Sequence, residues 1–332
     1  MPTPGLGHKS YVQIIKEAAY GTALAATAKF ECISFDIAPI IGTIEDASLY
    51  NQQSRRALYQ GGLLYRGTIV VRLNYEGLIR LFEGVFGSAV KSGPTESVVY
   101  TYTCKEAAAL PSYTIELIEG DIPATKCQQV VGAKFTSITV RGSAGQGNEG
   151  MLTAEIGVLA KDKVSNVTPA SLSFPAIFPV LFHQAITADE GSDSAAADIR
   201  VRSFEVTLEN ALAEDRFYFT SVNIEEPVRD NFLEARFRIE QEFVNITLFN
   251  RARAFTTANL QFVFRHPDLI VGASTLKREF ELRSGSAVLE NYSNPVEGYG
   301  IIIARSTWRA FYDPTDLSAL VARLQNKENI TV

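Results

Sequence analysis

Residues 233–240 read Leu233-Glu-Ala-Arg-Phe-Arg-Ile-Glu240, and apolar and charged side chains alternate in them without a break. Successive side chains of a strand point to opposite faces, so this segment would have one apolar face and one fully charged face. Such a strand packs one side on a core and leaves the other in water, as in antiparallel sheets. The segment therefore predicts a mainly β protein.

The same alternation recurs at residues 113–117, 152–158 and 204–209. In the first of these segments Tyr113, Ile115 and Leu117 share the expected core face. Glu116 is expected on the outward face of this strand, with Glu119 and Asp121 in the turn after it, because carboxylates are ordinarily solvated. The sequence thus predicts several half-buried strands.

Helical periodicity is confined to a few segments. The side chains of Leu78, Leu81, Phe82, Val85 and Phe86 share one helical face, and Gly87 stands where a C-terminal cap belongs. Residues 316–324, Asp316-Leu-Ser-Ala-Leu-Val-Ala-Arg-Leu324, predict a C-terminal helix capped by Asp316 or Thr315.

The arrangement of a strand followed by a helix occurs twice. A shift of 166 residues, from 71 to 237, places Val71 on Phe237 and carries Phe82 to Leu248. The second helix is then expected near residues 242–254. We interpret this pattern as an internal duplication. It predicts an N-terminal arm at 1–30, a first domain at 31–165, a connector at 166–199 with 191–197 as its loosest part, and a second domain at 200–332.

Composition excludes several classes of protein. The chain has 332 residues, of which 46% are apolar, so a sizeable core is possible and global disorder is excluded. The net charge is −6, with 31 basic and 37 acidic residues, which gives no electrostatic footprint for gripping nucleic acid. The sequence has no apolar run long enough to predict a membrane span and no signal peptide, so a soluble protein made in a cytoplasm is expected.

No segment predicts a catalytic or metal site. Residues 145–150 match the GxGxxG pattern, but a strand pattern follows where dinucleotide binding needs a helix, so a hairpin loop is predicted. The three histidines, His8, His183 and His266, lack metal-ligand spacing. The three cysteines, Cys32, Cys104 and Cys127, form no CxxC pair. We therefore expect no enzyme activity, no metal and no cofactor.

Several short segments together resemble a known family. Residues 15–22 contain Glu17-x-x-Tyr20-Gly21-Thr22, and residues 66–78 run from a strand into Tyr75-Glu-Gly-Leu78. Leu110-Pro-Ser and Gly132-Ala-Lys-Phe open two later strands. Residues 204–212 and 225–229 supply Asn210 and a polar turn that ends at Arg229. In their order and spacing these segments resemble the duplicated tail tube proteins of long-tailed phages, with Ala211 where that family usually has a second Asn.

This resemblance implies two tandem β-sandwich or barrel-like tail-tube domains, each with a flanking α-helix, whose strands line the channel of a closed ring. It implies three subunits per ring and stacking through loops and a terminal arm. The implied partners are further copies of the chain and tape-measure, terminator and baseplate or tip proteins, with DNA passing transiently and without specific binding. The implied place is the virion tail, assembled in the host cytoplasm, with no membrane.

Three polar or Gly-rich segments are expected to be mobile before assembly and to make the contacts between rings: residues 1–22, 51–63 and 142–150. An excess of carboxylates on the channel wall would keep DNA from adhering. The residues expected to take part in assembly are Glu17, Tyr20, Gly21, Thr22, Gly142, Gly145, Gly147, Gly150 and Arg229.

Other functions remain open at this point. A two-domain sandwich could serve in adhesion or receptor binding, which predicts exposed aromatic clusters on loops. A glycosidase on a β scaffold would need two facing carboxylates, and nothing in the sequence selects such a pair. A tail terminator or neck protein is a related structural alternative.

Overall fold

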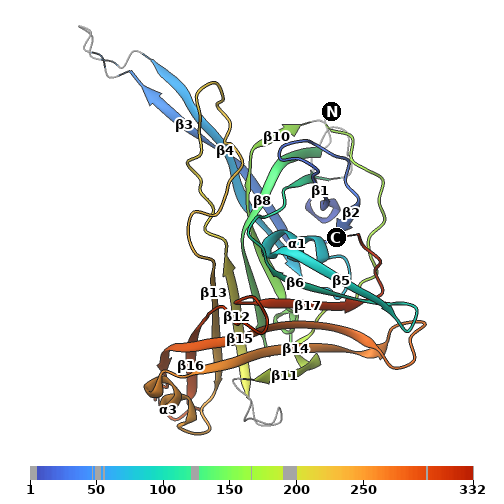
Figure 1. Cartoon of the computed structure of the whole chain (residues 1–332), viewed down its shortest axis with the longest axis vertical. Helices are drawn as coiled ribbons and strands as arrows, with labels where there is room; N and C mark the ends of the chain where they lie inside the picture. Colours follow the sequence, from blue (N-terminus) through green and yellow to red (C-terminus); the bar gives the residue numbers. More distant parts are fainter. Residues whose placement is uncertain are drawn as a thin grey trace.

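The computed structural model describes residues 6–46, 48, 54, 57–120, 127–165, 167–189, 200–296 and 298–331. Within these residues the protein is mainly β, as predicted, and its strands form one large hydrogen-bonded sheet with two α-helices beside it (Figure 1). No helix in this part of the chain is long and apolar enough to cross a membrane. Residues 191–197, expected to be the loosest part of the connector, lie outside the described residues.

The elements fall into two runs along the chain. The first run comprises η1 (Gly7–Lys9), β1 (Tyr11–Lys16), β2 (Ala28–Phe30), β3 (Ser34–Glu45), β4 (Leu58–Arg72), α1 (Ile79–Phe86), β5 (Gly87–Thr95), β6 (Val99–Glu106), β7 (Tyr113–Ile118), β8 (Cys127–Ser143), η2 (Asn148–Gly150), β9 (Thr153–Ala160) and β10 (Asp162–Ser165). The second run comprises η3 (Phe182–Gln184), β11 (Ala185–Asp189), β12 (Val201–Glu209), β13 (Glu234–Glu242), α3 (Thr247–Ala254), β14 (Thr257–Leu269), β15 (Lys277–Ser293), β16 (Ile303–Ala310) and β17 (Val321–Asn326).

The second run repeats the topology of the first. The order η1-β1-β3-β4-α1-β7-β8-β9-β10 corresponds to η3-β11-β12-β13-α3-β14-β15-β16-β17. Six pairings of the first repeat have counterparts in the second: β1–β7 matches β11–β14, β3–β4 matches β12–β13, β4–β9 matches β13–β16, β7–β8 matches β14–β15, β8–β9 matches β15–β16, and β8–β10 matches β15–β17. The β1–β2 and β5–β6 pairings occur in the first repeat alone among the described residues. The topology therefore supports an internal duplication, while the domain boundaries stay predictions.

The predicted offset between the repeats was wrong by two residues. The two helices begin at Ile79 and at Thr247, an offset of 168. The same offset carries Ile69 to Phe237. These two residues occupy equivalent places in the sheet, because Ile69 lies opposite Ile156 of β9 and Phe237 lies opposite Trp308 of β16. A slip of two residues keeps every strand side chain on its original face, so alternation alone cannot detect it. The expected second helix is confirmed, but it begins at Thr247 rather than near 242.

One row of strands runs through both repeats, in the order β3-β4-β9-β8-β12-β13-β16-β15. β14, β15 and β17 run across the direction of β8, β12 and β13, and the long β3–β4 hairpin projects from the body (Figure 1). β17 also pairs with β6, which joins the end of the chain to the first repeat.

Stacked aromatic rings fill the space between these layers. Phe262 of β14 lies 4.6 Å from Phe204 of β12 and 6.2 Å from Phe237 of β13, measured between ring centroids. Phe280 of β15 lies 5.5 Å from Phe82 of α1, so the core of the second repeat is continuous with the helix of the first. Burying each such side chain contributes about 1.5–3 kcal/mol.

The predicted C-terminal helix is wrong. Residues 314–317 form a turn, and residues 321–326 form strand β17 between β15 and β6. Ala322, Leu324 and Asn326 are buried with the period of a strand. Two neighbouring strands with open hydrogen-bonding groups thus outweigh the local helical propensity of this segment.

The expected solvation of Glu116 is also wrong. Its side chain is 1% exposed, and its carboxylate accepts bonds from the backbone N–H groups of Ala26 (3.3 Å) and Ala170 (3.2 Å). Glu119 is exposed as expected, and Asp121 lies outside the described residues.

The N-terminal segment is not a free arm throughout its length. β1 lies between β2 and β7, and Val12 and Ile14 are fully buried. Within the expected mobile segment 51–63, residues 58–63 belong to β4, whereas 51–53 and 55–56 lie outside the described residues.

Candidate assembly surface

The two repeats join edge to edge through β8 and β12. Val140 lies opposite Val206 and both are buried, while Thr139 and Thr207 meet on the outer face with their Oγ1 atoms 3.3 Å apart. The antiparallel register runs over seven residue pairs, from Ser203 opposite Ser143 to Glu209 opposite Ser137. The junction satisfies backbone groups that would otherwise form two open sheet edges.

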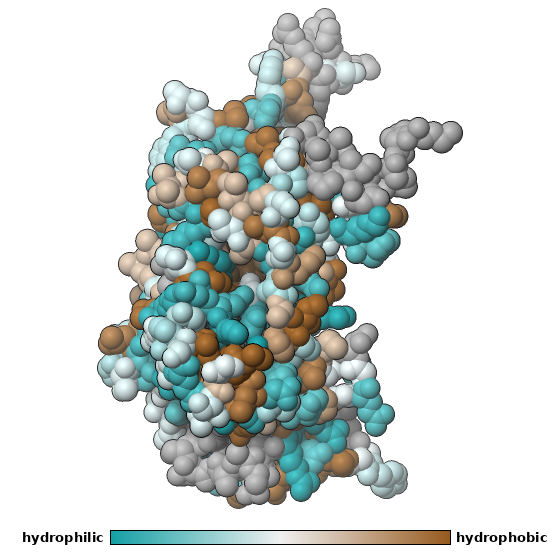
Figure 2. Space-filling model, turned by 90° about the vertical axis from the view of Figure 1, so that its right-hand side faces the viewer, coloured by the Kyte–Doolittle hydropathy of each residue, from teal (hydrophilic) through white to brown (hydrophobic). Residues whose placement is uncertain are grey.

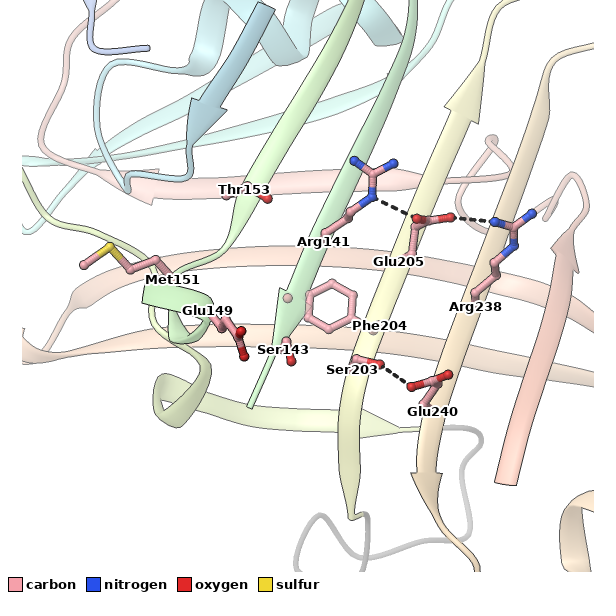
Figure 3. A pocket seen from close by; sticks show the side chains of 11 residues that line it. Arg141, Ser143, Glu149, Met151, Thr153, Ser203, Phe204, Glu205, Arg238 and Glu240 are labelled. Atoms are coloured by element: carbon pink, nitrogen blue, oxygen red, sulfur yellow. Dashed lines mark hydrogen bonds and ion pairs between the residues drawn. The ribbon is translucent and has the colours of Figure 1, made fainter. Parts of the chain in front are cut away.

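Ion pairs cross this junction on its outer face (Figure 3). Glu205 accepts a bond from Nε of Arg141 (2.9 Å) and another from Nη1 of Arg238 (3.0 Å), and Arg141 also donates to Glu155 (2.7 Å). These pairs are largely exposed, so each adds little stability, but the network fixes which residues face each other. Glu240 is likewise paired with Arg305 at 3.1 Å. The charges around the junction are therefore paired, and the expected excess of carboxylates on a channel wall stays a prediction.

The Gly-rich loop after β8 closes one end of the junction. Ala144 donates its N–H to the carbonyl of Arg202 at 2.7 Å. A Cβ atom at Gly142 would lie 2.4 Å from Cε1 of Phe204, and one at Gly150 would lie 2.9 Å from Cδ1 of Phe182. Glycine is therefore needed for close approach at these two positions. Strand β9 follows the loop after η2, so the predicted hairpin loop is confirmed.

Of the other two glycines in this loop, Gly145 faces the side chain of Glu149 and Gly147 faces open space. Gly142 thus lies in β8 and the other three glycines lie in the loop after it, and this segment contacts the second repeat of the same chain. Whether they also contact a neighbouring ring stays a prediction.

Glu17, Tyr20, Gly21 and Thr22 form a turn that is fastened inside the first repeat. The carboxylate of Glu17 accepts bonds from Oγ1 of Thr114 (2.9 Å), from N of Gly132 (2.8 Å) and from N of Gly21 (2.9 Å). Gly21 has φ +73°, a conformation that glycine adopts without strain. Thr22 is exposed.

The ring of Tyr20 connects this turn to the second repeat. Burial raises the pKa of Tyr20, so the phenol stays neutral, and Nζ of Lys134 lies 6.0 Å from its ring centroid. Lys134 is buried and donates to Glu226 (2.7 Å) and to the carbonyl of Pro227 (2.9 Å). The turn thus has a structural role within the chain, and its part in contacts between subunits stays a prediction.

Arg229 acts through Asn210, which is fully buried. Nη2 of Arg229 donates to Oδ1 of Asn210 at 2.7 Å, and Nδ2 of Asn210 donates to the carbonyls of Val85 (2.8 Å) and Phe135 (3.0 Å). Val85 is in the last turn of α1, where carbonyls lack helical partners. One amide therefore links the end of α1, strand β8 and the loop after β12.

Ala211, next in the chain, has φ +45°. A left-handed conformation costs a residue with a Cβ atom about 1–2 kcal/mol, and Asn tolerates it better than Ala. We therefore expect Ala211→Asn to raise the free energy of unfolding by about 0.5–1 kcal/mol in denaturant titrations. The control Ala109→Asn, at an exposed site without positive φ, should change it by less than about 0.5 kcal/mol. Equal effects would contradict the strain at Ala211.

A buried charge cluster fastens the end of the chain to the turn before α1. Nε of Arg278 donates to Oε1 of Glu76 at 2.7 Å, and both side chains are buried. Oε2 of Glu328 accepts the N–H of Gly77 at 2.8 Å, and Nδ2 of Asn326 donates to the carbonyl of Tyr75 at 2.8 Å. The sequence analysis missed this cluster because its members lie about 200 to 250 positions apart in the chain.

Burial raises the pKa of Glu328 to about 7, and the charge of Glu76 adds to this effect. The stability from the neutral carboxyl is fully present below pH 4.5 and is lost as the pH rises through 7. We expect Glu328→Gln to raise the free energy of unfolding by about 2 kcal/mol at pH 8.5 and to leave it nearly unchanged at pH 4. Glu119→Gln is the exposed control, and an equal gain from Glu328→Gln at both pH values would contradict the shift.

Two strand edges stay open at opposite ends of the row that runs through both repeats. Within the described residues β3 pairs only with β4, and β15 pairs beyond Val288 only with β16. The β3 edge is protected in two ways, because Lys163 donates its Nζ to the carbonyl of Ile37 at 2.7 Å and Pro39 interrupts the donors. Ile33, just before β3, is 52% exposed, whereas its counterpart Phe204 is 8% exposed.

Large apolar side chains are exposed at the far end of the molecule. The β3–β4 hairpin exposes Ile40, Ile41, Ile44, Leu58 and Tyr59, and the loop beside it exposes Tyr218 and Phe219. This loop is fastened to β4, because Leu63 donates its N–H to Val222 O (2.7 Å). Figure 2 shows one face of the molecule, on which hydrophobic residues form separate clusters among hydrophilic ones. No group of metal-ligating side chains occurs in the described part of the chain.

The model of a family described as "Phage tail tube protein" matches residues 7–310, which is most of the chain. No curated protein matches it.

Proposed function

The chain belongs to the phage tail tube protein family, and on this premise we propose that it closes into rings that stack into the tube through which phage DNA passes. The family is one of structural virion proteins, so the role proposed is structural rather than enzymatic. The observation that supports it best is the internal β8–β12 junction together with the two open edges at β3 and β15.

The repeat predicts how neighbouring copies join. Inside one chain, β8 of the first repeat pairs with β12 of the second. Their counterparts are β15 of the second repeat and β3 of a first repeat, which must come from another copy. The equivalence places Asn291 of one copy opposite Asp36 of the next, as Thr139 lies opposite Thr207. Every copy would use the same two edges, so the contact is head-to-tail and produces a ring when the rotation closes.

Three copies would supply six equivalent repeats to such a ring. The row of strands from β3 to β15 would then continue around the channel without an open edge. Outside the row, the exposed apolar residues of the β3–β4 hairpin and of the adjacent loop would contact the next ring, because apolar side chains gathered at one end of a molecule mark an interaction surface.

The chemistry of the paired outer face suits passage of DNA without binding. Arg141 and Arg238 are paired with the two carboxylates of Glu205 and Glu155, which weakens the attraction of this part of the face for phosphates. In the assembled tail the chain would contact further copies of itself, a tape-measure protein inside the tube and terminator and baseplate or tip proteins at its ends. Assembly would take place in the host cytoplasm.

Negative-stain electron microscopy of the purified protein, with its solution mass, tests the proposal. Stacked rings or tubes built from three copies each are expected. A stable monomer that forms no ring at high concentration would count against it and would favour a second candidate, an adhesion module. The specific observation for that candidate is the exposed Tyr218–Phe219 loop, and glycan binding would be its assay.

A further inference from the structure

The described surface contains a cavity of about 640 Å³ beside the open β3 edge. Its walls come from η1, from the chain just before β3, from the end of β4 and from the connector, and they include His8, Cys32, Ile33, Leu73, Leu78 and Ile177. They are mostly apolar, and Glu31 and Arg72 add hydrogen-bonding groups. A cavity of this size and character suits an aromatic or aliphatic side chain with a polar tip.

The internal junction shows what occupies the corresponding place in the second repeat. There the loop after β8 contacts the start of β12 through the Ala144–Arg202 bond, and it contacts η3 through Gly150 and Phe182. The counterpart of Arg202 is Glu31, and the counterpart of η3 is η1, which contains His8. Both counterparts line the cavity. The loop that would reach them follows β15, the counterpart of β8.

This second loop has the same length as the first, since residues 294–304 separate Ser293 from its partner Arg305 and residues 142–152 separate Arg141 from Thr153. Its side chains differ. Where the first loop is rich in glycine, the second exposes Val296 (72%), Ile301 (64%) and the fully exposed Tyr299. Tyr299 lies between Gly298 and Gly300, and its exposed ring is available to a neighbouring copy.

We infer that the loop after β15 of one copy enters the cavity beside β3 of the next copy, with Tyr299 as its anchor. The inference rests on the proposed function, because the β15–β3 pairing brings the loop to the cavity. Val296 and Ile301 contact the apolar rim around Ile33, and the hydroxyl of Tyr299 reaches the polar groups of the wall. Buried aromatic anchors of this kind supply much of the energy of an interface.

A cysteine at position 299 tests the contact directly, because native Cys32 lines the cavity. The other two cysteines, Cys104 and Cys127, are fully buried and give no background. Burial raises the pKa of Cys32 to about 11, so the bond is formed with an added oxidant such as copper phenanthroline. Oxidised Tyr299→Cys rings should yield disulfide-linked multimers on non-reducing gels, and Cys32→Ser should abolish them. Phe219→Cys, at a site 99% exposed on another loop, should form no bond with Cys32.

Tyr299→Ala supplies the second measurement. It should leave the thermal midpoint of the monomer unchanged, since the side chain is fully exposed there, and raise the concentration at half-assembly about tenfold or more. Normal ring formation by Tyr299→Ala, together with Tyr299→Cys rings that form no disulfide with Cys32, would overturn this inference and leave the proposed function standing. A wild-type chain that never assembles would overturn both.

Discussion

Replacing Asn210 with alanine is expected to lower the free energy of unfolding by about 3–4 kcal/mol. The variant loses two bonds to the buried carbonyls of Val85 and Phe135 and removes the acceptor of Arg229. Each buried group left without a partner costs about 1–3 kcal/mol, and the guanidinium is charged. A loss of this size is a large fraction of the stability of a domain, so much of the variant should be insoluble when expressed at 37 °C.

The matched control is Asn329→Ala, because the amide of Asn329 is exposed and accepts its bond from Lys91 at the surface. It should change the free energy of unfolding by less than about 0.5 kcal/mol. A double-mutant cycle with Arg229→Met should show that the two losses are not additive, because both residues belong to one network. Additive effects, or a loss below about 1 kcal/mol for Asn210→Ala, would contradict the role of this amide.

The second large effect is expected from a cysteine pair, Asp36→Cys with Asn291→Cys, in a Cys32→Ser background. Both native side chains are exposed, so the monomer should fold as before. If β15 pairs with β3 of the next copy in the register of the internal junction, oxidation should convert nearly all rings into covalent multimers that end at three chains. The readout is a non-reducing gel together with mass measurement.

Thr139→Cys with Thr207→Cys is the internal standard for this pair. The bonds from Asn210 N to Thr136 O and from Ala144 N to Arg202 O place Thr139 and Thr207 at a non-hydrogen-bonded position, where side chains lie closest. This pair should form a disulfide within one chain. Efficient bonding of the internal pair without bonding between positions 36 and 291 in assembled rings would contradict the predicted register.

Local patterns in the sequence predicted much of the fold. Alternation at 233–240 predicted β13, and the helical face from Leu78 to Phe86 predicted α1, because each pattern records which side of the element is buried. The segment from Asp316 to Leu324 misled because its partners, β15 and β6, are remote in the chain. The burial of Glu116 was missed for a related reason. The backbone N–H groups that donate to its carboxylate belong to Ala26 and Ala170, which are remote in the chain.

The candidate site was less accessible to sequence reasoning. The Gly-rich loop at 142–150 attracted attention through its composition, yet it closes a junction within the chain. Its counterpart after β15 has no recognisable motif. A contact role for Tyr299 follows only from the pairing of β15, from the repeat and from the exposure of the side chain. Residues that meet through topology, such as Glu76 and Arg278, leave no periodic trace in a single sequence.

The order in which the residues are synthesised matters for how the first repeat is completed. Asn326 and Glu328 hold the turn at residues 75–77, and β17 supplies the partner of β6, so the first repeat depends on residues translated about 250 positions later. Until β17 has been synthesised, the β6 edge stays open. The first repeat is thus finished only after the second repeat has been made, and chains that lack β17 would enter growing tails as incomplete subunits only at the cost of this missing strand.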